Sequence, residues 1–152
     1  MVQTAKRHEF AVGLDEVGVM FAEGRAQLDP PRAWTPEHLL LGALARCSMA
    51  SLRFHARRAG LATDGRATAS GAITRRGGDG RFAFVEEHVA LDVHITPEPA
   101  EEVLVALLKR AERDCFVGAS HTIAPGYAWR VNGRDVETMS AQELLEARHP
   151  EP

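Results

Sequence analysis

The chain has 152 residues, of which 45% are hydrophobic and 26% charged, and its formal net charge is -3 at pH 7. This length suits one domain with a sizeable core, and this composition excludes a disordered or fibrous protein. The slight negative charge provides no basic field for nucleic acid or an anionic membrane. We therefore expect a single domain over residues 1–152 that binds neither of these partners.

The sequence contains no recognisable secretory signal and no transmembrane segment. Its first ten residues, MVQTAKRHEF, lack an apolar core and a small-residue cleavage site, and no apolar run approaches the length that spans a bilayer. We expect a cytoplasmic protein. In that reducing compartment, two cysteines are more typical of inert, catalytic or redox-active thiols than of a structural disulfide.

The first predicted elements are strands within residues 8–28, followed by a helix over 36–59. The runs EFAVGL and VGVMFA, separated by a turn, predict the strands. Thr35 suits the helix N-cap and Gly60 its end. Apolar or small residues recur every three or four positions along this helix, a spacing that places them on one core-facing stripe. They are Leu40, Leu44, Cys47, Ser51 and Phe54.

The middle of the chain reads as a β-hairpin over residues 66–96. RATASGAITRR predicts one strand, GGDG a tight turn, and RFAFVEEHVALDVHIT a long second strand. From Val89 to Thr96, apolar and polar residues alternate, which indicates a sheet with one buried face.

The last third predicts a helix over 97–115, a strand over 127–131 and a short helix over 140–147. Thr96 and the following proline resemble a helix start, and a buried stripe runs from Leu104 to Cys115. The sequence YAWRV alternates like a strand, and Ser140 with Glu143 forms a capping box.

Several familiar chemistries are excluded by the motifs that the sequence lacks. It has no glycine-rich phosphate loop, C-x-x-C, H-E-x-x-H or G-x-S-x-G. His88 and His94 would share a strand face at about 20 Å, too far apart to hold one metal ion. We therefore expect no metal site.

Each cysteine is predicted on the buried stripe of its own helix. A buried cysteine usually behaves as an inert small hydrophobe, which is the simplest interpretation of Cys47 and Cys115. If the two helices pack together, however, the sulfurs approach disulfide distance, as in a redox catalyst. The residue pattern leaves both interpretations open.

A reactive Cys47 needs a nearby positive charge, because only the thiolate is nucleophilic and an apolar surrounding raises the thiol pKa. Arg46 points about 100° away around the helix. An arginine from elsewhere, held by a carboxylate, suits better because guanidinium stays charged in a dry site. Arg25 and Arg32 are the upstream candidates.

The stretch TPEHLLLGALARCSMASL contains a Pro-Glu pair followed by an alanine-containing helix with the first cysteine, and AERDCFVGAS contains the second cysteine. In order and spacing, the two stretches resemble the cysteine motifs of the OsmC/Ohr family of thiol-dependent hydroperoxide reductases. The resemblance extends over residues 8–131. His38 stands where many members have a second glutamate, and Phe116 replaces the proline that usually follows the second cysteine.

The resemblance implies an α+β fold, with antiparallel sheets wrapped around two central helices in an intertwined homodimer. It implies that Cys47 is the peroxidatic cysteine and Cys115 the resolving one. Glu37 would orient the activating arginine, for which Arg32 is preferred over Arg25. On one straight helix, Glu37 and Cys47 are about 15 Å apart along the axis, so a long arginine, a bent helix start or a partner subunit must connect them.

The function expected from this resemblance is a peroxidase that reduces organic hydroperoxides to alcohols in oxidative-stress defence. A Cys47 sulfenic acid would condense with Cys115 to a disulfide, which a dithiol reductant, such as a lipoylated protein, would reduce. Met49, Phe54 and Phe116 would favour an alkyl-bearing substrate, and no bound cofactor is required. The alternatives are thiol chemistry with another electrophile, sulfur transfer, or a non-catalytic dimer that binds a hydrophobic ligand.

Overall fold

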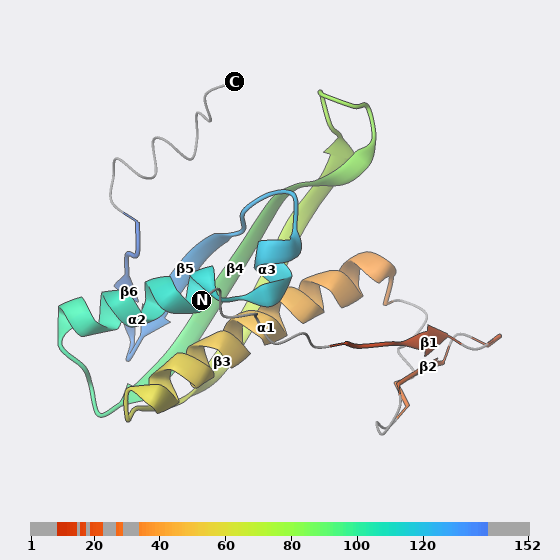
Figure 1. The fold of residues 1–152 in the computed structure, drawn as a ribbon. Helices are drawn as coiled ribbons and strands as arrows, with labels where there is room; N and C mark the ends of the chain where they lie inside the picture. Colours follow the sequence, from red (N-terminus) through yellow and green to blue (C-terminus); the bar gives the residue numbers. More distant parts are fainter. Residues whose placement is uncertain (1–8, 15, 18, 23–26, 29–33, 140–152) are drawn as a thin grey trace, which may run out of the picture. The chain divides into compact units, whose positions relative to one another are not determined.

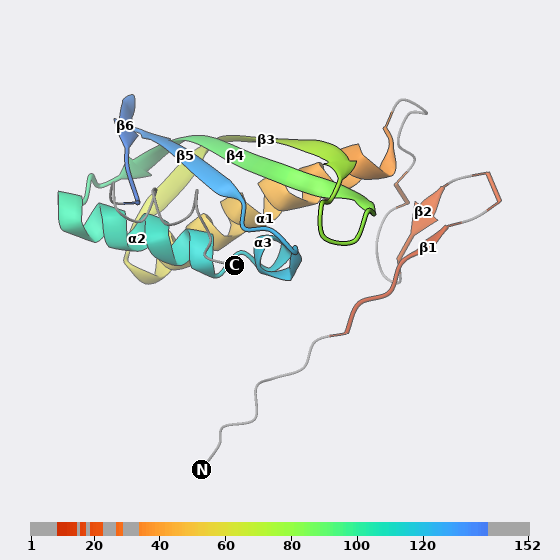
Figure 2. The same cartoon turned by 90° about the horizontal axis from the view of Figure 1, so that it is seen from above.

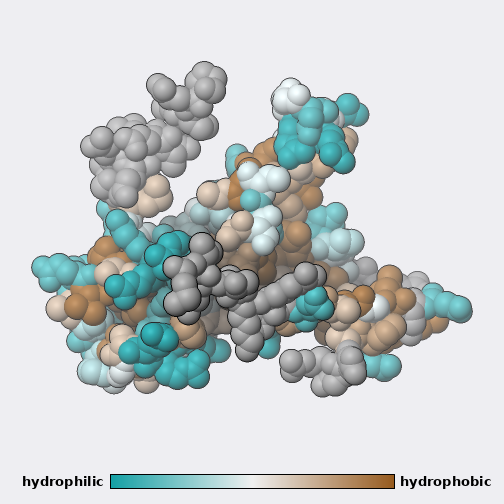
Figure 3. Space-filling model, viewed as in Figure 1, coloured by the Kyte–Doolittle hydropathy of each residue, from teal (hydrophilic) through white to brown (hydrophobic). Residues whose placement is uncertain are grey.

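The computed structural model describes residues 9–14, 16–17, 19–22, 27–28 and 34–139, and the chain divides into two compact units, 1–37 and 38–152. The predicted helix 140–147 lies outside the described residues. In the first unit, β1 (Gly13–Leu14) pairs antiparallel with β2 (Met20–Phe21). Large apolar side chains of this unit are exposed, and Figure 3 shows their brown surface around β1 and β2. They include Phe10, Val12, Leu14, Val17 and Phe21.

Helix α1 spans Pro36–Arg58, and its two ends follow the residues that favour them. Proline and glutamate open the first turn, where a missing N–H and a negative charge are tolerated or favoured. Gly60 has φ 75°, and its N–H donates to Arg57 O, while Leu61 N–H donates to Ala56 O. These two bonds form a Schellman motif, so the glycine ends the helix and turns the chain into the next strand.

The second unit contains a four-stranded sheet in the order β3-β4-β5-β6. Strands β3 (Ala62–Arg75) and β4 (Phe82–Thr96) form a long antiparallel hairpin. Strand β5 (Gly126–Val131) pairs parallel with β4, and β6 (Arg134–Val136) pairs antiparallel with β5. The β4 to β5 connection contains two helices, and Figures 1 and 2 show α1, α2 and α3 together on one face of the sheet.

The core lies between this sheet face and the helices. Along β4, the buried side chains alternate with exposed or half-buried ones, as the sequence alternation predicts. The same alternating register begins with a buried carboxylate, Glu87. Ala72 pairs with Glu86 and Ile73 pairs with Phe84, so Val85 is the extra residue of a β-bulge.

Helix α2 (Glu101–Arg113) and helix α3 (Phe116–Ser120) replace the single helix predicted over 97–115. Thr96 cannot open a helix, because it is the last residue of β4 and pairs with Ala62. Cys115 has an extended backbone, with φ -72° and ψ 105°, so it separates the two helices and is the N-cap of the second. The buried stripe from Leu104 to Ala111 is present as predicted.

The predicted stripe on α1 is only partly buried. Leu44 and Ser51 face the core, but Leu40 and Phe54 are 36% and 48% exposed. The core-facing stripe instead steps four residues at a time from Leu44, because the sheet covers that side of the helix. Its members are Leu44, Ser48, Leu52 and Ala56. Cys47 therefore lies at the edge of the core, half-buried.

Strand β6 was not predicted, and the turn before it explains why the chain reverses. Asn132 and Gly133 have positive φ angles of 50° and 83°, as a two-residue hairpin turn requires. The Asn132 side chain accepts the Ile95 N–H and donates to the Ile95 carbonyl, at 2.9 and 3.1 Å. This clamp attaches the β5 to β6 turn to the end of β4. No helix among the described residues has the length and apolar character to span a membrane.

Helix α2 provides a test of this packing, because a fully buried leucine lies beside an exposed valine. Leu104→Ala should lower the free energy of unfolding by about 2 to 5 kcal/mol, since it leaves a cavity between helix and sheet. The matched control Val103→Ala should change it by about 0.5 kcal/mol or less. Urea denaturation measures both. Equal losses in the two variants would contradict this arrangement.

Candidate active site

The two cysteines meet in the second unit. Cys47 lies on α1 at the edge of the core, and Cys115 lies between α2 and α3 with no solvent exposure. Both are free thiols, and Cys115 lies close enough to raise the pKa of Cys47. The fold thus brings a half-buried thiol and a buried thiol close together from segments far apart in the sequence.

The turn at Cys115 is held in place from two sides. Ala119 N–H donates to the Cys115 carbonyl at 2.9 Å, and Gly118 N–H donates to its sulfur at 3.5 Å. The preceding Asp114 accepts from Arg113 at 2.7 Å and lies 2.9 Å from His55 Nε2 on α1. Arg113, and then His55, lower the pKa of the Asp114 carboxyl. This close approach places the turn against the helix that bears Cys47.

The surroundings of Cys47 favour its protonated form within one chain. Burial is the largest influence and raises its pKa, and the hydrogen bond and charge of Cys115 raise it further. The backbone N–H groups of Val117 and Phe116 act in the opposite direction, because they stabilise the thiolate. The net shift is upward, so a reactive thiolate needs an additional positive charge.

The predicted source of that positive charge is an upstream arginine. Arg32 and Arg25 lie outside the described residues. Glu37 lies in the first turn of α1, ten residues before Cys47 on the same helix. Of the predicted site residues, the structure brings together Cys47 and Cys115.

A serine and a tyrosine that sequence reasoning missed surround the buried thiol. Ser48, directly after Cys47, is buried, and its hydroxyl donates to Leu44 O at 2.9 Å. Ser48 Oγ also lies 3.5 Å from Cys115 Sγ and 3.4 Å from Tyr127 OH. We name Ser48, Cys115 and Tyr127 the hydroxyl–thiol cluster. Ser48 lies four residues after Leu44 on the observed core-facing stripe, which differs from the stripe that the sequence predicted.

A buried contact between a carboxylate and a histidine is a second feature that the sequence analysis did not identify. Glu87 on β4 has a side chain only 1% exposed, and its Oε2 lies 2.6 Å from His121 Nδ1. The histidine directly follows α3. The signal was available, because Glu87 continues the period-two register of the buried β4 residues. The pair ties the end of α3 to the sheet and borders a hollow of about 140 Å³.

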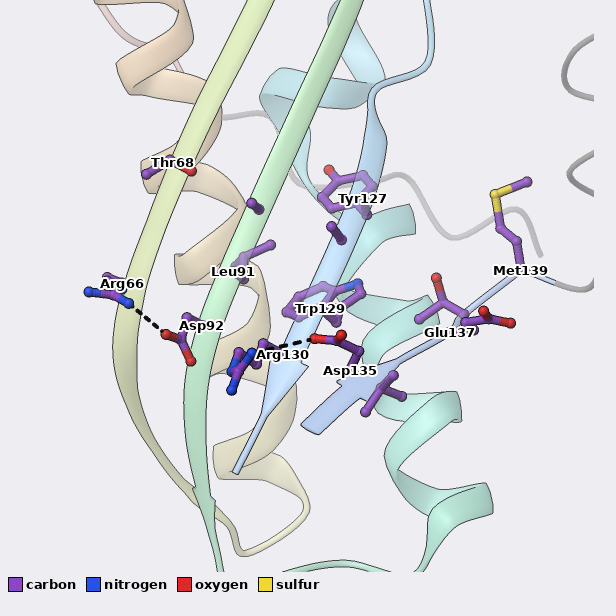
Figure 4. Close-up of a pocket in the computed structure, with 14 residues that line it drawn as sticks. Arg66, Thr68, Leu91, Asp92, Tyr127, Trp129, Arg130, Asp135, Glu137 and Met139 are labelled. Carbon is purple, nitrogen blue, oxygen red and sulfur yellow. Dashed lines mark hydrogen bonds and ion pairs between the residues drawn. The ribbon is translucent and has the colours of Figure 1, made fainter. Parts of the chain in front are cut away.

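A hollow lined by the sheet strands does not include either cysteine among its lining residues. It has a volume of about 800 Å³, and Figure 4 shows its lining side chains on strands β3 to β6 and the segment after them. Ion pairs Arg66–Asp92 and Arg130–Asp135 cross between its strands, at 2.9 and 4.0 Å. A smaller hollow, of about 340 Å³, lies beside α2 and α3. Tyr127 lines both and connects them to the hydroxyl–thiol cluster.

Metal ligation finds no support in the part of the chain that the structure describes. No group of three or more histidine, cysteine, aspartate or glutamate side chains is arranged there to hold a metal ion. The chemistry that the described site offers is that of two adjacent thiols, with backbone N–H donors and two hydroxyl groups around them.

Tyr127 is the only tyrosine in the chain, so its ionisation can be measured by itself. Burial is the main cause that raises its pKa well above the usual value of about 10. In an alkaline titration followed by tyrosinate absorbance, the folded protein should ionise well above the urea-unfolded protein. Because the unfolded state ionises first, the free energy of unfolding should fall as the pH rises above about 10. Tyr127→Phe should remove that part of the decline, and coincident titrations would contradict the burial of the phenol.

Solved structures of similar fold come from several bacteria. An OsmC-like protein of unknown function from Vibrio cholerae has a TM-score of 0.65 and 14% identity, over 82% of this chain and 99% of that chain. An OsmC-like protein from Mycoplasma pneumoniae has a TM-score of 0.62 and 17% identity, over 83% of this chain and 97% of that chain. An organic hydroperoxide resistance protein from Elizabethkingia anophelis has a TM-score of 0.57 and 17% identity, over 85% of this chain and 99% of that chain. These similarities establish the α+β fold.

Among curated protein sequences, none matches this chain. A family model does match, over residues 29–130, and this range includes both cysteines and most of the described sheet. The match covers more than half of the sequence. The chain belongs to the family of OsmC-like proteins.

Proposed function

We propose that this protein is a cysteine-based peroxidase that reduces organic hydroperoxides to alcohols in oxidative-stress defence. The observation that carries the proposal is the proximity of two free thiols, one half-buried at the core edge and one fully buried, which is close enough for Cys115 to raise the pKa of Cys47. A catalyst that forms and breaks a disulfide needs this pairing, whereas two inert core cysteines have no need to meet. The membership of the OsmC-like family, with hydroperoxide resistance proteins among its structural relatives, also supports a redox role.

The chemistry divides into two steps. In the first, the Cys47 thiolate attacks the distal oxygen of the hydroperoxide, the O–O bond breaks, and an alkoxide leaves and takes up a proton. Cys47 is then a sulfenic acid. In the second, Cys115 sulfur attacks the Cys47 sulfur, and hydroxide leaves as water to give the disulfide. A dithiol, for which a lipoyl group on a partner protein is one candidate, returns both residues to thiols.

The raised pKa of Cys47 means that the first step needs a cation. We assign this role to Arg32, with Arg25 as the alternative, and assign the orientation of the guanidinium to Glu37. A second copy of the chain would complete the site in an intertwined homodimer. The exposed apolar side chains of the first unit support such an association, because a monomer rarely exposes so many together.

An alkyl-bearing substrate agrees with the side chains around Cys47. Leu40 and Phe54 lie seven residues before and after it on α1, and both are exposed. Phe116, whose N–H interacts with Cys47, is 81% exposed. Met49, which we had expected near the substrate, is instead buried in the core. The apolar groups available to an alkyl chain are therefore Leu40, Phe54 and Phe116.

One equivalent of cumene hydroperoxide, added to the reduced protein, tests this function. We expect rapid loss of both thiols and a mass decrease of two hydrogens, slower with equal hydrogen peroxide. Cys115→Ser should stop at a Cys47 sulfenic acid that dimedone traps, and Cys47→Ser should lose no thiol rapidly.

Other outcomes distinguish the alternatives. Two persistent thiols in the wild-type protein would contradict a peroxidase. Reaction at Cys47 with a different electrophile, unaffected by Cys115→Ser, would favour another thiol chemistry or sulfur transfer. Tight retention of a hydrophobic ligand after loss of both thiols would favour a binding protein.

A further inference from the structure

We propose that Ser48 and Tyr127 form a two-hydroxyl relay that removes the proton of Cys115 when this thiol acts as a nucleophile. The inference rests on the proposed function and deepens it, because it assigns side chains to the second of the two steps. It starts from the hydroxyl–thiol cluster, in which Cys115 Sγ and Tyr127 OH both lie within 3.5 Å of Ser48 Oγ.

Ser48 determines which groups of the cluster donate and which accept hydrogen bonds. A serine hydroxyl has one proton and two acceptor lone pairs, and the Ser48 proton is directed at the Leu44 carbonyl. Ser48 therefore accepts from both remaining neighbours, the Cys115 S–H and the Tyr127 O–H. In this resting arrangement, the Cys115 S–H and the Tyr127 O–H both donate to Ser48 Oγ.

A buried thiol in that arrangement has no direct exchange with water. Cys115 has no exposed surface, so its proton cannot pass straight to solvent when the sulfur attacks. A thiolate is nevertheless required for the attack. The proton must travel through a neighbouring group, and Ser48 is the hydroxyl whose acceptor lone pair already faces the S–H.

Tyr127 provides the connection from Ser48 to solvent. It is half-buried and lines the hollow of about 340 Å³ beside α2 and α3, a volume that can hold several water molecules. The charged groups Lys109, Glu112 and Arg113 line the same hollow. A Cβ added at Gly118 would lie at van der Waals distance from the cluster, 3.4 Å from Tyr127 OH and 3.6 Å from Cys115 Sγ. The glycine therefore leaves unfilled the space that a side chain would occupy there.

The relay step conserves every proton. Ser48 rotates its O–H from Leu44 O toward Tyr127, and Tyr127 turns its O–H toward water in the hollow. The Cys115 proton then passes to Ser48, the Ser48 proton to Tyr127, and the Tyr127 proton to water. The Cys115 thiolate attacks the Cys47 sulfur, the hydroxide that leaves takes up one proton, and the two hydroxyl groups rotate back.

The test measures the two chemical steps separately. Reduced protein is mixed with cumene hydroperoxide, quenched at intervals with dimedone and an alkylating reagent, and analysed by intact mass. Tyr127→Phe and Ser48→Ala should leave the rate of Cys47 oxidation unchanged and slow disulfide formation by about a hundredfold. Both should also lower the solvent deuterium isotope effect on disulfide formation, and Ser48→Thr should restore most of the rate because it retains the hydroxyl.

The matched control is Ser51→Ala. Ser51 is also a buried serine of α1, but its hydroxyl donates to Ala111 O at 2.8 Å and belongs to a different contact. This variant should form the disulfide at the wild-type rate. Equal slowing by Ser51→Ala, or no slowing by both Tyr127→Phe and Ser48→Ala, would overturn the relay.

A second oxidant, diamide, tests the relay without any peroxide chemistry. Diamide adds to Cys47, and the Cys115 thiolate then displaces the reduced hydrazine to form the same disulfide. If cumene hydroperoxide is inert and the two variants still slow the diamide reaction, the proposed peroxidase function fails and the relay stands. If wild-type and variants form the disulfide at one rate with diamide, the relay is wrong whatever the peroxide result.

Discussion

The break between α2 and α3 is the constraint on which the candidate site depends. Asp114 and Cys115 leave the helical conformation there, while Asp114 lies 2.9 Å from His55 Nε2 on α1. Because the chain turns at this point, the Cys115 sulfur and the N–H groups of Phe116 and Val117 all lie next to Cys47. A continuous helix would use those N–H groups in its own hydrogen bonds. Local disruption of regular structure thus supplies the polar groups that the thiol pair needs in an otherwise apolar core.

Much of the architecture follows from patterns that a single sequence contains. The helix bearing Cys47 was predicted from its proline start and its glycine end, and the buried face of β4 from its alternation. Thr96 misled the prediction, because a local start signal cannot reveal that the residue pairs with Ala62 across a hairpin. Tertiary pairing overrode local preference there. Strand β6 was missed for a different reason, because its three residues are too few to show a period-two pattern.

The candidate site was less predictable than the fold, for a physical reason. Helical spacing and family resemblance were enough to select Cys47 and Cys115, but the partners of Cys115 come from α1, α3 and β5. Tyr127 looked like an ordinary apolar strand residue, because the residues next to it in the sequence do not indicate which distant group its hydroxyl contacts. Glu87 was recognisable in principle, because a carboxylate in a buried register has to be paired.

The bulge at Val85 divides the long hairpin into two parts of unequal protection. From Val89 to Ile95, alternate side chains are buried in the core, whereas residues 73–75 and 81–82 of the distal part are exposed on both faces. Backbone amides of a two-stranded ribbon with little buried apolar surface open at low free energy. The distal hairpin should therefore exchange its amide hydrogens through local opening, while the amides of β4 that flank the core exchange only when the whole second unit unfolds. A ribbon that opens by itself can rearrange without disturbing the thiol pair.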